Sequence, residues 1–367
     1  MKRLLCIIDS LNVGGAETFL MKVMRCLPPE EYQFDFLVSK AGGVYEREVL
    51  ERGGSIYTVP PRRRNLLSAF QGIRTVVKQH DYSYVLRLGD APIVGIDLLA
   101  AKWGGANHLA FRSCNALTGL SFQARAVNSV MRPILNGIAN TKLAPSKLAA
   151  EFTFGKRFAK DAHILHNGVD LQKYSYDPAG RNAIREEFHL QDKLVVGHIG
   201  RFNKQKNHRY LLEVFREISV QRDDAVLLLV GTGEDRDLIC GWIRELGLEN
   251  KVIMAGQRFD IPQLLSAMDV FVFPSLHEGM PNTVIEAQAT GLPCVIADTI
   301  TREANITGLV QYLPLSESVS EWARVALEAS ALLRKDTAED FRSQGYDIES
   351  VAKEFITLLG MTDDTAK

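Results

Sequence analysis

Three short segments of the sequence combine glycines, cations or carboxylates at spacings that suit an anionic ligand. The first is Asn12-Val13-Gly14-Gly15-Ala16-Glu17, in which two glycines precede an expected helix. Because glycine has no Cβ, backbone N–H groups at a helix N-terminus can approach a phosphate closely. The segment lacks the full G-x-G-x-x-G spacing, so an ordinary tight turn between a strand and a helix stays an alternative.

The second segment runs from residue 197 to residue 208 and joins an expected strand to an expected helix. Its Arg201 and Lys206 place two cations beside the carboxyl end of that strand, directly after Gly200. Two cations suit a diphosphate, because each forms charge-assisted hydrogen bonds with phosphate oxygens. A solvated basic loop is the plainer alternative.

The third segment is Glu278-Gly279-Met280-Pro281-Asn282-Thr283-Val284-Ile285-Glu286, with two glutamates eight residues apart. We expect a helix to begin near Asn282 and Thr283, and the N-terminus of a helix attracts anions. Glu278 in the loop and Glu286 one turn into the helix can then face one ligand. The alternative is a capping box, in which Thr283 and Glu286 bond only the backbone at the start of the helix.

Signals for a metal site are weak. Asp235-Arg236-Asp237 has a D-x-D spacing but falls where a helix should start, a position in which acidic residues stabilise the helix dipole. His163 and His166 have no third ligand at a metal-binding spacing. The five cysteines are scattered without a C-x-x-C pair, which predicts reduced thiols and no zinc site. We expect neither a metal nor a cofactor.

The elements that must position these segments follow a regular pattern. Apolar stretches of strand length alternate with amphipathic stretches, which predicts parallel α/β sheets. The expected strands are residues 4–8, 34–38, 56–59, 84–88, 109–112, 143–145 and 163–166, then 194–199, 225–230, 252–255, 270–273 and 294–297. The fold class is therefore α/β, with two Rossmann-like doubly wound domains that face a cleft, and ligands are expected at the carboxyl ends of the strands. Between residues 166 and 194 a polar stretch with Pro178 and Gly180 predicts the linker.

Composition and charge narrow the class of protein. The 367 residues are 46% hydrophobic and 24% charged, which is typical of globular proteins and excludes a disordered or collagen-like chain. No apolar run reaches the roughly 18 residues of a membrane span, and the first one ends at Asp9, too early for a signal peptide. Residues 1–170 carry a net charge of +8 and residues 171–367 carry −9. The basic half predicts an anionic partner, either nucleic acid or an anionic membrane surface.

A basic cluster supports the membrane alternative. Arg62-Arg63-Arg64 precedes an apolar stripe at helical spacing, consisting of Leu66, Leu67, Phe70, Ile73, Val76 and Val77. Such a stretch suits contact with a membrane surface, although packing against a core explains the apolar stripe equally well.

Taken together, the motifs resemble the superfamily of retaining GT-B-fold glycosyltransferases with an E-x7-E motif, known as glycosyl transferases group 1. Within it, the second half of the chain is most similar to the exopolysaccharide and capsule branch. The resemblance covers nearly the whole chain and rests on one set of motifs in order: Gly14-Gly15-Ala16-Glu17, Asn167-Gly168-Val169-Asp170, Gly200-Arg201 with Lys206, and Glu278 to Glu286 followed by Gly291-Leu292-Pro293.

The resemblance implies a GT-B fold with an acceptor-binding domain (residues 1–168), a nucleotide-sugar-binding domain (169–345) and a final segment (346–367) whose helix crosses back to the first domain. It implies a retaining enzyme that moves a hexose or N-acetylhexosamine from a nucleotide sugar, by branch analogy a UDP-sugar, without a metal. The acceptor is lipid-linked or a glycan, in exopolysaccharide, capsule or cell-surface polysaccharide synthesis. The expected location is cytoplasmic and peripheral, at the inner face of the cell membrane, without nucleic acid as a partner.

The same resemblance assigns roles to residues. Arg201 and Lys206 neutralise the diphosphate, Glu278 bonds the donor sugar, and these three are the expected catalytic residues. Glu286 bonds the ribose. The remaining donor-binding residues are Gly14 and Gly15 on the diphosphate, Gln257 and Arg258 near the base, and Gly279, Met280, Pro281, Asn282 and Thr283 around the phosphate and sugar.

One departure from the family pattern affects the acceptor side. Relatives in this branch usually read His-Ser-His-Asn where this sequence has Arg112-Ser113-Cys114-Asn115. In an inverting enzyme this change would threaten the general base, whereas in a retaining same-face mechanism the leaving phosphate takes the acceptor proton. We place Arg112 and Asn115 on the acceptor side. Two alternatives stay open, namely a non-catalytic sugar-nucleotide-binding partner subunit and a UDP-sugar 2-epimerase of the same fold.

Overall fold

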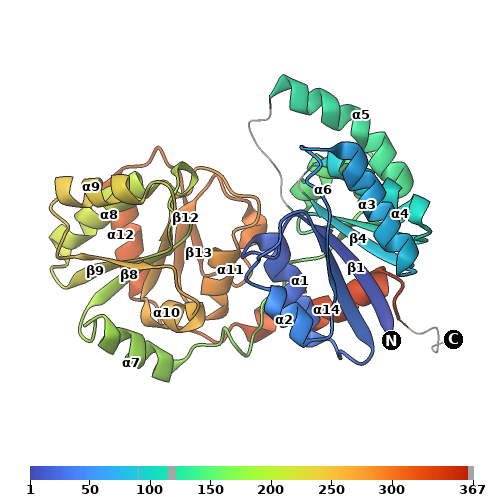
Figure 1. Ribbon diagram of the computed structural model, residues 1–367. Coiled ribbons are helices and arrows are strands. Elements are labelled where there is room, and N and C mark those ends of the chain that lie inside the picture. Colours follow the sequence, from blue (N-terminus) through green and yellow to red (C-terminus); the bar gives the residue numbers. More distant parts are fainter. Residues whose placement is uncertain (90, 115–120, 363–367) are drawn as a thin grey trace. The chain divides into compact units, whose positions relative to one another are not determined.

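The structure is a computed structural model that describes residues 1–89, 91–114 and 121–362 (Figure 1). The chain divides into two compact units. Unit 1 contains Met1–Gly168 together with the chain from Gly345 onward, and unit 2 is Val169–Gln344.

The described part of unit 1 contains a parallel sheet of seven strands in the order β3-β2-β1-β4-β5-β6-β7. The strands are β1 (Lys2–Ile8), β2 (Tyr32–Val38), β3 (Ile56–Thr58), β4 (Tyr84–Gly89), β5 (His108–Ser113), β6 (Thr141–Ala144) and β7 (His163–Ile164). The helical segments are α1 (Gly15–Cys26), α2 (Glu46–Glu51), α3 (Leu66–Gln79), η1 (Pro92–Gly95), α4 (Ile96–Gly104), α5 (Phe122–Ile138), α6 (Lys147–Phe154), η2 (Ala159–Asp161) and α14 (Ile348–Leu358).

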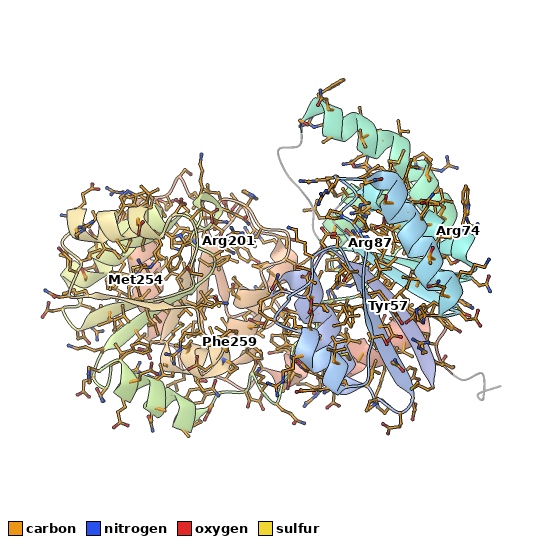
Figure 2. All side chains as sticks on the ribbon, in the orientation of Figure 1. Tyr57, Arg74, Arg87, Arg201, Met254 and Phe259 are labelled. Atoms are coloured by element: carbon orange, nitrogen blue, oxygen red, sulfur yellow. The ribbon has the colours of Figure 1, made fainter. Side chains whose placement is uncertain are left out.

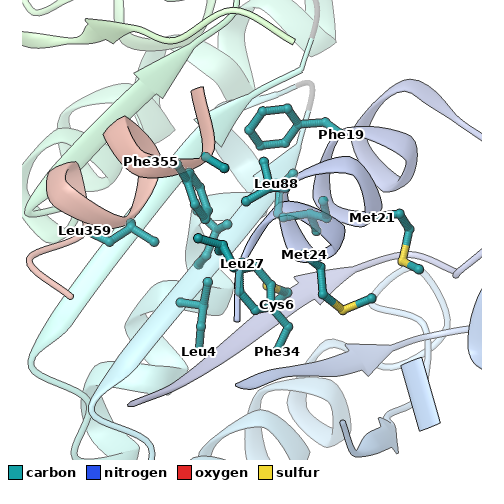
Figure 3. Packing of buried hydrophobic residues seen from close by; sticks show 14 of the residues in the cluster. Leu4, Cys6, Phe19, Met21, Met24, Leu27, Phe34, Leu88, Phe355 and Leu359 are labelled. Atoms are coloured by element: carbon teal, nitrogen blue, oxygen red, sulfur yellow. The ribbon is translucent and has the colours of Figure 1, made fainter. Parts of the chain in front are cut away.

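Alternate residues of the strands supply two separate cores on the two faces of this sheet. On one face Leu4 and Cys6 pack with α1 and α14, where the rings of Phe19 and Phe355 meet edge to face at 5.7 Å (Figure 3). On the other face Leu5 and Ile7 pack with side chains of α3, α4, α5 and α6. The final helix therefore belongs to the core of unit 1, although 176 residues of unit 2 precede it in the chain.

The described part of unit 2 repeats this plan with six parallel strands in the order β10-β9-β8-β11-β12-β13. The strands are β8 (Leu194–Ile199), β9 (Ala225–Val230), β10 (Val252–Gly256), β11 (Val270–Phe273), β12 (Cys294–Ala297) and β13 (Val310–Leu313). The helical segments are α7 (Pro178–Glu187), η3 (Lys204–Lys206), α8 (His208–Gln221), α9 (Arg236–Glu245), α10 (Ile261–Ala267), α11 (Asn282–Ala289), η4 (Arg302–Ala304), α12 (Val319–Ser330) and α13 (Ala338–Ser343).

Both sheets reverse their strand order at one point, which is where doubly wound folds bind ligands. In unit 1 the reversal lies between the adjacent strands β1 and β4, and in unit 2 it lies between β8 and β11. The loops that follow β8 and β11 therefore leave the sheet side by side at its carboxyl edge.

The prediction of two doubly wound parallel sheets is confirmed. The boundary between the units falls after Gly168, inside the stretch of residues 166–194 that the sequence assigned to the linker, but this stretch also contains a helix that was not predicted, α7. Asp177 caps this helix by accepting a hydrogen bond from the Gly180 amide at 2.9 Å, and Pro178 is its first residue. Proline at that position starts a helix, since its missing N–H would have no partner there. The sequence analysis also missed α2, α13 and β13.

Candidate functional site

The two segments with the strongest chemical signal meet at the reversal point of unit 2. The Lys206 Nζ lies 2.7 Å from Glu278 Oε1, and both side chains are mostly shielded from solvent. Lys206 comes from the loop after β8 and Glu278 from the loop after β11. Residues 72 positions apart in the chain thus form one ion pair at the carboxyl edge of the sheet.

Hydrogen bonds hold these two loops together. The Gln205 carbonyl accepts a hydrogen bond from the Leu276 amide at 2.8 Å, and the Gln205 side chain donates to the His277 carbonyl at 2.8 Å. The side chain of Asn207 donates to the Pro274 carbonyl at 3.2 Å. These three connections around the ion pair fix the position of one loop relative to the other.

Gly200 leaves the space that Lys206 occupies. A Cβ at this position would lie 3.1 Å from Lys206 Cε and 3.3 Å from His198 Nε2, tighter than ordinary van der Waals contact. The Lys206 ammonium in turn lies 4.5 Å from the centroid of the Phe273 ring, a cation–π distance. Even an alanine at position 200 would require the Lys206 or His198 side chain to shift by a few tenths of an ångström.

Arg201 occupies a more open position than Lys206. Its guanidinium lies 3.1 Å from Glu234, and the Arg201 side chain is 70% exposed (Figure 2). Glu234 belongs to the loop after β9. Gly231 lets this loop lie close to Gly200, because a Cβ on Gly231 would lie 2.0 Å from the Gly200 carbonyl oxygen. An exposed ion pair contributes little free energy, so Arg201 can turn to an anionic ligand at small cost.

The third segment begins α11 without a capping side chain. Pro281 is the N-cap residue, and its carbonyl accepts hydrogen bonds from the Val284 and Ile285 amides at 3.0 and 3.2 Å. Thr283 lies inside the helix, so the capping box proposed from the sequence does not form. The half-buried Glu286 follows one turn into the helix. The start of this helix, where Pro281 supplies no side-chain cap, is a favourable place for an anion.

Two buried histidines lie beneath Lys206, and the sequence analysis assigned them no role. His198 is the fifth residue of β8 and His208 the first of α8, with ring centroids 5.0 Å apart. Burial lowers the pKa of His198 well below its usual value, and burial with the nearby Lys206 lowers the pKa of His208 to about 4. Both rings are neutral at pH 7, so they add no positive charge under Lys206.

The side chain of Arg258 is already paired. It makes bidentate contacts with Glu187 at 2.5 and 2.9 Å, and with Asp260 at 2.9 and 2.6 Å. Gln257, its neighbour after β10, is exposed. Two carboxylates therefore hold the Arg258 guanidinium, and Gln257 is the more open of the two side chains predicted to lie near the base.

The glycine-rich segment of unit 1 precedes α1 as expected, with Gly14 as the N-cap residue. The carboxylate of Glu17 folds back over it, so that a Cβ on Gly14 would lie 2.4 Å from Glu17 Oε2. Gly15 is exposed and has open space at its Cβ position. A diphosphate can approach Gly14 only if Glu17 turns away, whereas Gly15 is accessible as it stands.

Arg112 is buried in unit 1. Its Nη2 donates to Asn167 Oδ1 at 2.7 Å, and its guanidinium lies 3.7 Å from the centroid of the Phe19 ring. Burial lowers its pKa to about 10. The side chain thus ties α1 to the end of unit 1's first segment. At 1% exposure it presents almost no surface to solvent, and its predicted place on the acceptor side stays a prediction. Asn115 lies outside the described residues.

No group of three or more His, Cys, Asp or Glu side chains in the described ranges could hold a metal ion. Asp237 of the D-x-D segment lies in the first turn of α9 with its side chain in solvent, as the helix-dipole interpretation expects. None of the helices in the part of the chain that the structure describes is both long enough and apolar enough to cross a bilayer.

Comparisons with known proteins add the following. The family model described as glycosyl transferases group 1 matches residues 180–340. EpsF of Bacillus subtilis (strain 168), a protein named for glycosyltransferase activity, is 32% identical over 365 residues, which is 95% of this chain and 94% of EpsF. A second relative, the UDP-Gal:alpha-D-GlcNAc-diphosphoundecaprenol alpha-1,3-galactosyltransferase of Escherichia coli, is 38% identical over 141 residues, 37% of this chain and 36% of that protein.

A solved structure has the same fold over the full length. Anabaena HepE in complex with UDP superimposes with a TM-score of 0.80 and 20% sequence identity, over 99% of this chain and 100% of that chain. At this identity the likeness concerns the fold alone.

Proposed function

The chain belongs to the glycosyl transferases of group 1, and we propose that it transfers a hexose or an N-acetylhexosamine from a UDP-sugar with retention of configuration. The acceptor in this proposal is a lipid-linked or glycan intermediate of exopolysaccharide, capsule or cell-surface polysaccharide synthesis. The name of one relative supports a UDP-sugar donor and a lipid-linked acceptor, since the Escherichia coli protein is named for UDP-Gal and a diphosphoundecaprenol acceptor.

The observation that carries the proposal is the meeting of Lys206 and Glu278 at the reversal point of unit 2. In the proposed complex Lys206 and Arg201 bind the diphosphate, and the start of α11 adds its amides and the positive end of its dipole. Glu278, released in part from Lys206, bonds the donor sugar, and Glu286 bonds the ribose hydroxyls.

These groups suit a leaving nucleoside diphosphate. As the glycosidic bond to phosphate breaks, negative charge grows on the phosphate oxygens, and fixed cations with a helix dipole stabilise that charge. The leaving phosphate itself takes the proton of the acceptor hydroxyl, so the proposal needs no histidine at positions 112 and 114 and no metal ion. Retained transfer in EDTA is the expected result, and loss of transfer that magnesium or manganese restores would contradict metal independence.

The experiment that tests donor binding combines a substrate screen with a variant. Purified protein is assayed for binding and hydrolysis of a panel of nucleotide sugars, and UDP affinity is then measured for Glu286→Gln. Loss of the charged acceptor for the ribose should weaken UDP binding by roughly 1.5–3 kcal/mol, about 10–150-fold, without a change in melting temperature.

Glu339→Gln is the matched control, since Glu339 is an exposed glutamate on the surface of α13. It should bind UDP like the unmodified chain. If Glu286→Gln also binds UDP unchanged, Glu286 does not contact the nucleotide and the assignment of the third segment to the donor is wrong.

A further inference from the structure

A group of buried rings packs together beneath Lys206. The centroid of the Phe273 ring is 4.5 Å from the Lys206 ammonium, and the His198 ring stacks beside Phe273 at 5.3 Å. The His208 ring meets His198 at 5.0 Å, with an angle of 74° between the two planes, and it lies 5.0 Å from the ring of Phe202. All four rings are buried, so packing fixes their places. They are called the aromatic floor below.

One ring of the aromatic floor ties together the two strands at the reversal point. His198 Nδ1 donates a hydrogen bond to the Val272 carbonyl at 2.9 Å, since a carbonyl oxygen can only accept. The other nitrogen of the neutral ring, Nε2, is then an acceptor. A Cβ on Gly200 would lie 3.3 Å from this nitrogen and 3.1 Å from Lys206 Cε, so the nitrogen and the lysine side chain border the same small space.

The charge state of the aromatic floor favours an ammonium above it. Burial, together with the nearby Lys206, lowers the pKa of His208 to about 4, and burial lowers the pKa of His198 well below its usual value. At pH 7 the lysine therefore meets neutral rings, whose faces attract a cation. A lysine side chain is otherwise flexible, and a side chain that is ordered before binding loses less entropy when the ligand arrives.

We propose that His208 and His198 are positioning residues, which hold the Lys206 side chain at the carboxyl edge of the sheet for the diphosphate of the donor. They act through Lys206 and do not touch the donor themselves. Removal of the His208 ring would open space in the aromatic floor, so that the lysine side chain could leave its place beside Glu278. The inference rests on the proposed function in one respect, which is that Lys206 binds the diphosphate.

The test measures the affinity of the full-length protein for UDP and for uridine. His208→Ala should weaken UDP binding about tenfold, the size expected when one charge-assisted hydrogen bond to phosphate is lost. Its affinity for uridine should stay unchanged, because uridine has no diphosphate for Lys206 to contact. His208→Phe should bind UDP like the unmodified chain, since it keeps a neutral ring in the aromatic floor.

A double variant shows whether His208 acts through the lysine. Lys206→Met alone should weaken UDP binding about tenfold or more. Adding His208→Ala to Lys206→Met should weaken it by less than about twofold further, because no ammonium is left to be positioned.

Ile218→Ala is the matched control for lost stability, because Ile218 is also buried on α8 but lies near the C-terminal end of that helix. Its melting temperature should fall, as that of His208→Ala should, while its affinities for UDP and uridine stay unchanged. A loss of UDP affinity in His208→Ala alone is then separated from a general loss of structure.

Three results would overturn the inference while the proposed function stands. His208→Ala could bind UDP as well as the unmodified chain does, or it could lose affinity for uridine as much as for UDP. The double variant could show the full losses of both single variants, which would mean that His208 does not act through Lys206. If the unmodified chain itself bound no UDP, the proposed function would be wrong and this inference with it, a result that is recognised without any variant.

Discussion

The two units place charged residues at the same reversal point of the same kind of sheet, but they use these charges differently. In unit 1 the charges form a closed network. Arg87 on β4 and Asp97 in the first turn of α4 are both buried, with Arg87 Nε 2.8 Å from Asp97 Oδ2. Arg87 also donates to the Ile7 carbonyl at 3.0 Å and to Asp9 at 3.2 Å, and Arg62 completes the pairing of Asp97.

In unit 2 the charges are less completely enclosed. Arg201 and its partner Glu234 are both largely exposed, and the Lys206–Glu278 pair lies above two neutral histidines. Burial raises the pKa of Asp97 in unit 1 even against two arginines, which means that its ionised form depends on both partners. Strand order thus determines where charges gather, while burial and pairing decide whether they can turn to a ligand.

The largest expected effect is loss of stability when the network of unit 1 is broken. Asp97→Asn leaves the buried Arg87 without its main counter-charge, and removal of one partner from a buried ion pair typically costs about 3–5 kcal/mol. Urea unfolding measures this change. Asp9→Asn is the control, because Asp9 is 74% exposed and should cost no more than about 0.5 kcal/mol. If Asp97→Asn and Asp9→Asn had the same free energy of unfolding, the buried charges of unit 1 would not form the stabilising network that distinguishes it from unit 2.

A smaller effect is expected from the histidines of unit 2. The pKa of His208 is about 4 in the folded chain, against 6.5 for an unperturbed histidine, so the unfolded chain binds an extra proton between these values. The contribution of His208 to the free energy of unfolding should therefore be fully present above about pH 6.5. It should decrease as the pH falls toward 4, by about 3 kcal/mol in total. His208→Phe should flatten this part of the curve of unfolding free energy against pH.

His163→Gln provides the comparison for the pH experiment, because His163 is exposed on β7 of unit 1. Its curve should keep the slope of the unmodified chain between about pH 4 and 6.5. A His208→Phe curve with the same slope would mean that His208 is not held neutral by burial.

Sequence reasoning predicted the sheets and the meeting of Lys206 with Glu278 for a physical reason. Apolar runs of strand length alternate with amphipathic stretches, and the rule that parallel strands end at one edge places Arg201, Lys206 and Glu278 together. The sequence analysis did not predict α7, because Pro178 and Gly180 are as typical of a linker as of the first turn of a helix. It also missed the pairing of Arg62 with Asp97, since contacts between residues 35 positions apart depend on three-dimensional packing.

The smallest expected effect concerns how two helices of equal length begin. α6 in unit 1 and α11 in unit 2 each have eight residues and follow a strand at the carboxyl edge. In α6 the Ser146 hydroxyl accepts a hydrogen bond from the Ala149 amide at 3.3 Å, whereas Pro281 gives α11 no side-chain cap. Ser146→Ala should therefore lower the free energy of unfolding by about 0.5–2 kcal/mol.

Thr283→Ala should change that free energy by no more than about 0.5 kcal/mol, because Thr283 lies inside α11 and does not cap it. UDP should raise the melting temperature of Thr283→Ala as much as that of the unmodified chain, since backbone amides provide the proposed phosphate contact. A loss of about 1 kcal/mol or more in the free energy of unfolding of Thr283→Ala would show that Thr283 caps the helix after all. The start of α11 would then be capped by Thr283, and it would no longer support a place for the donor phosphate in unit 2.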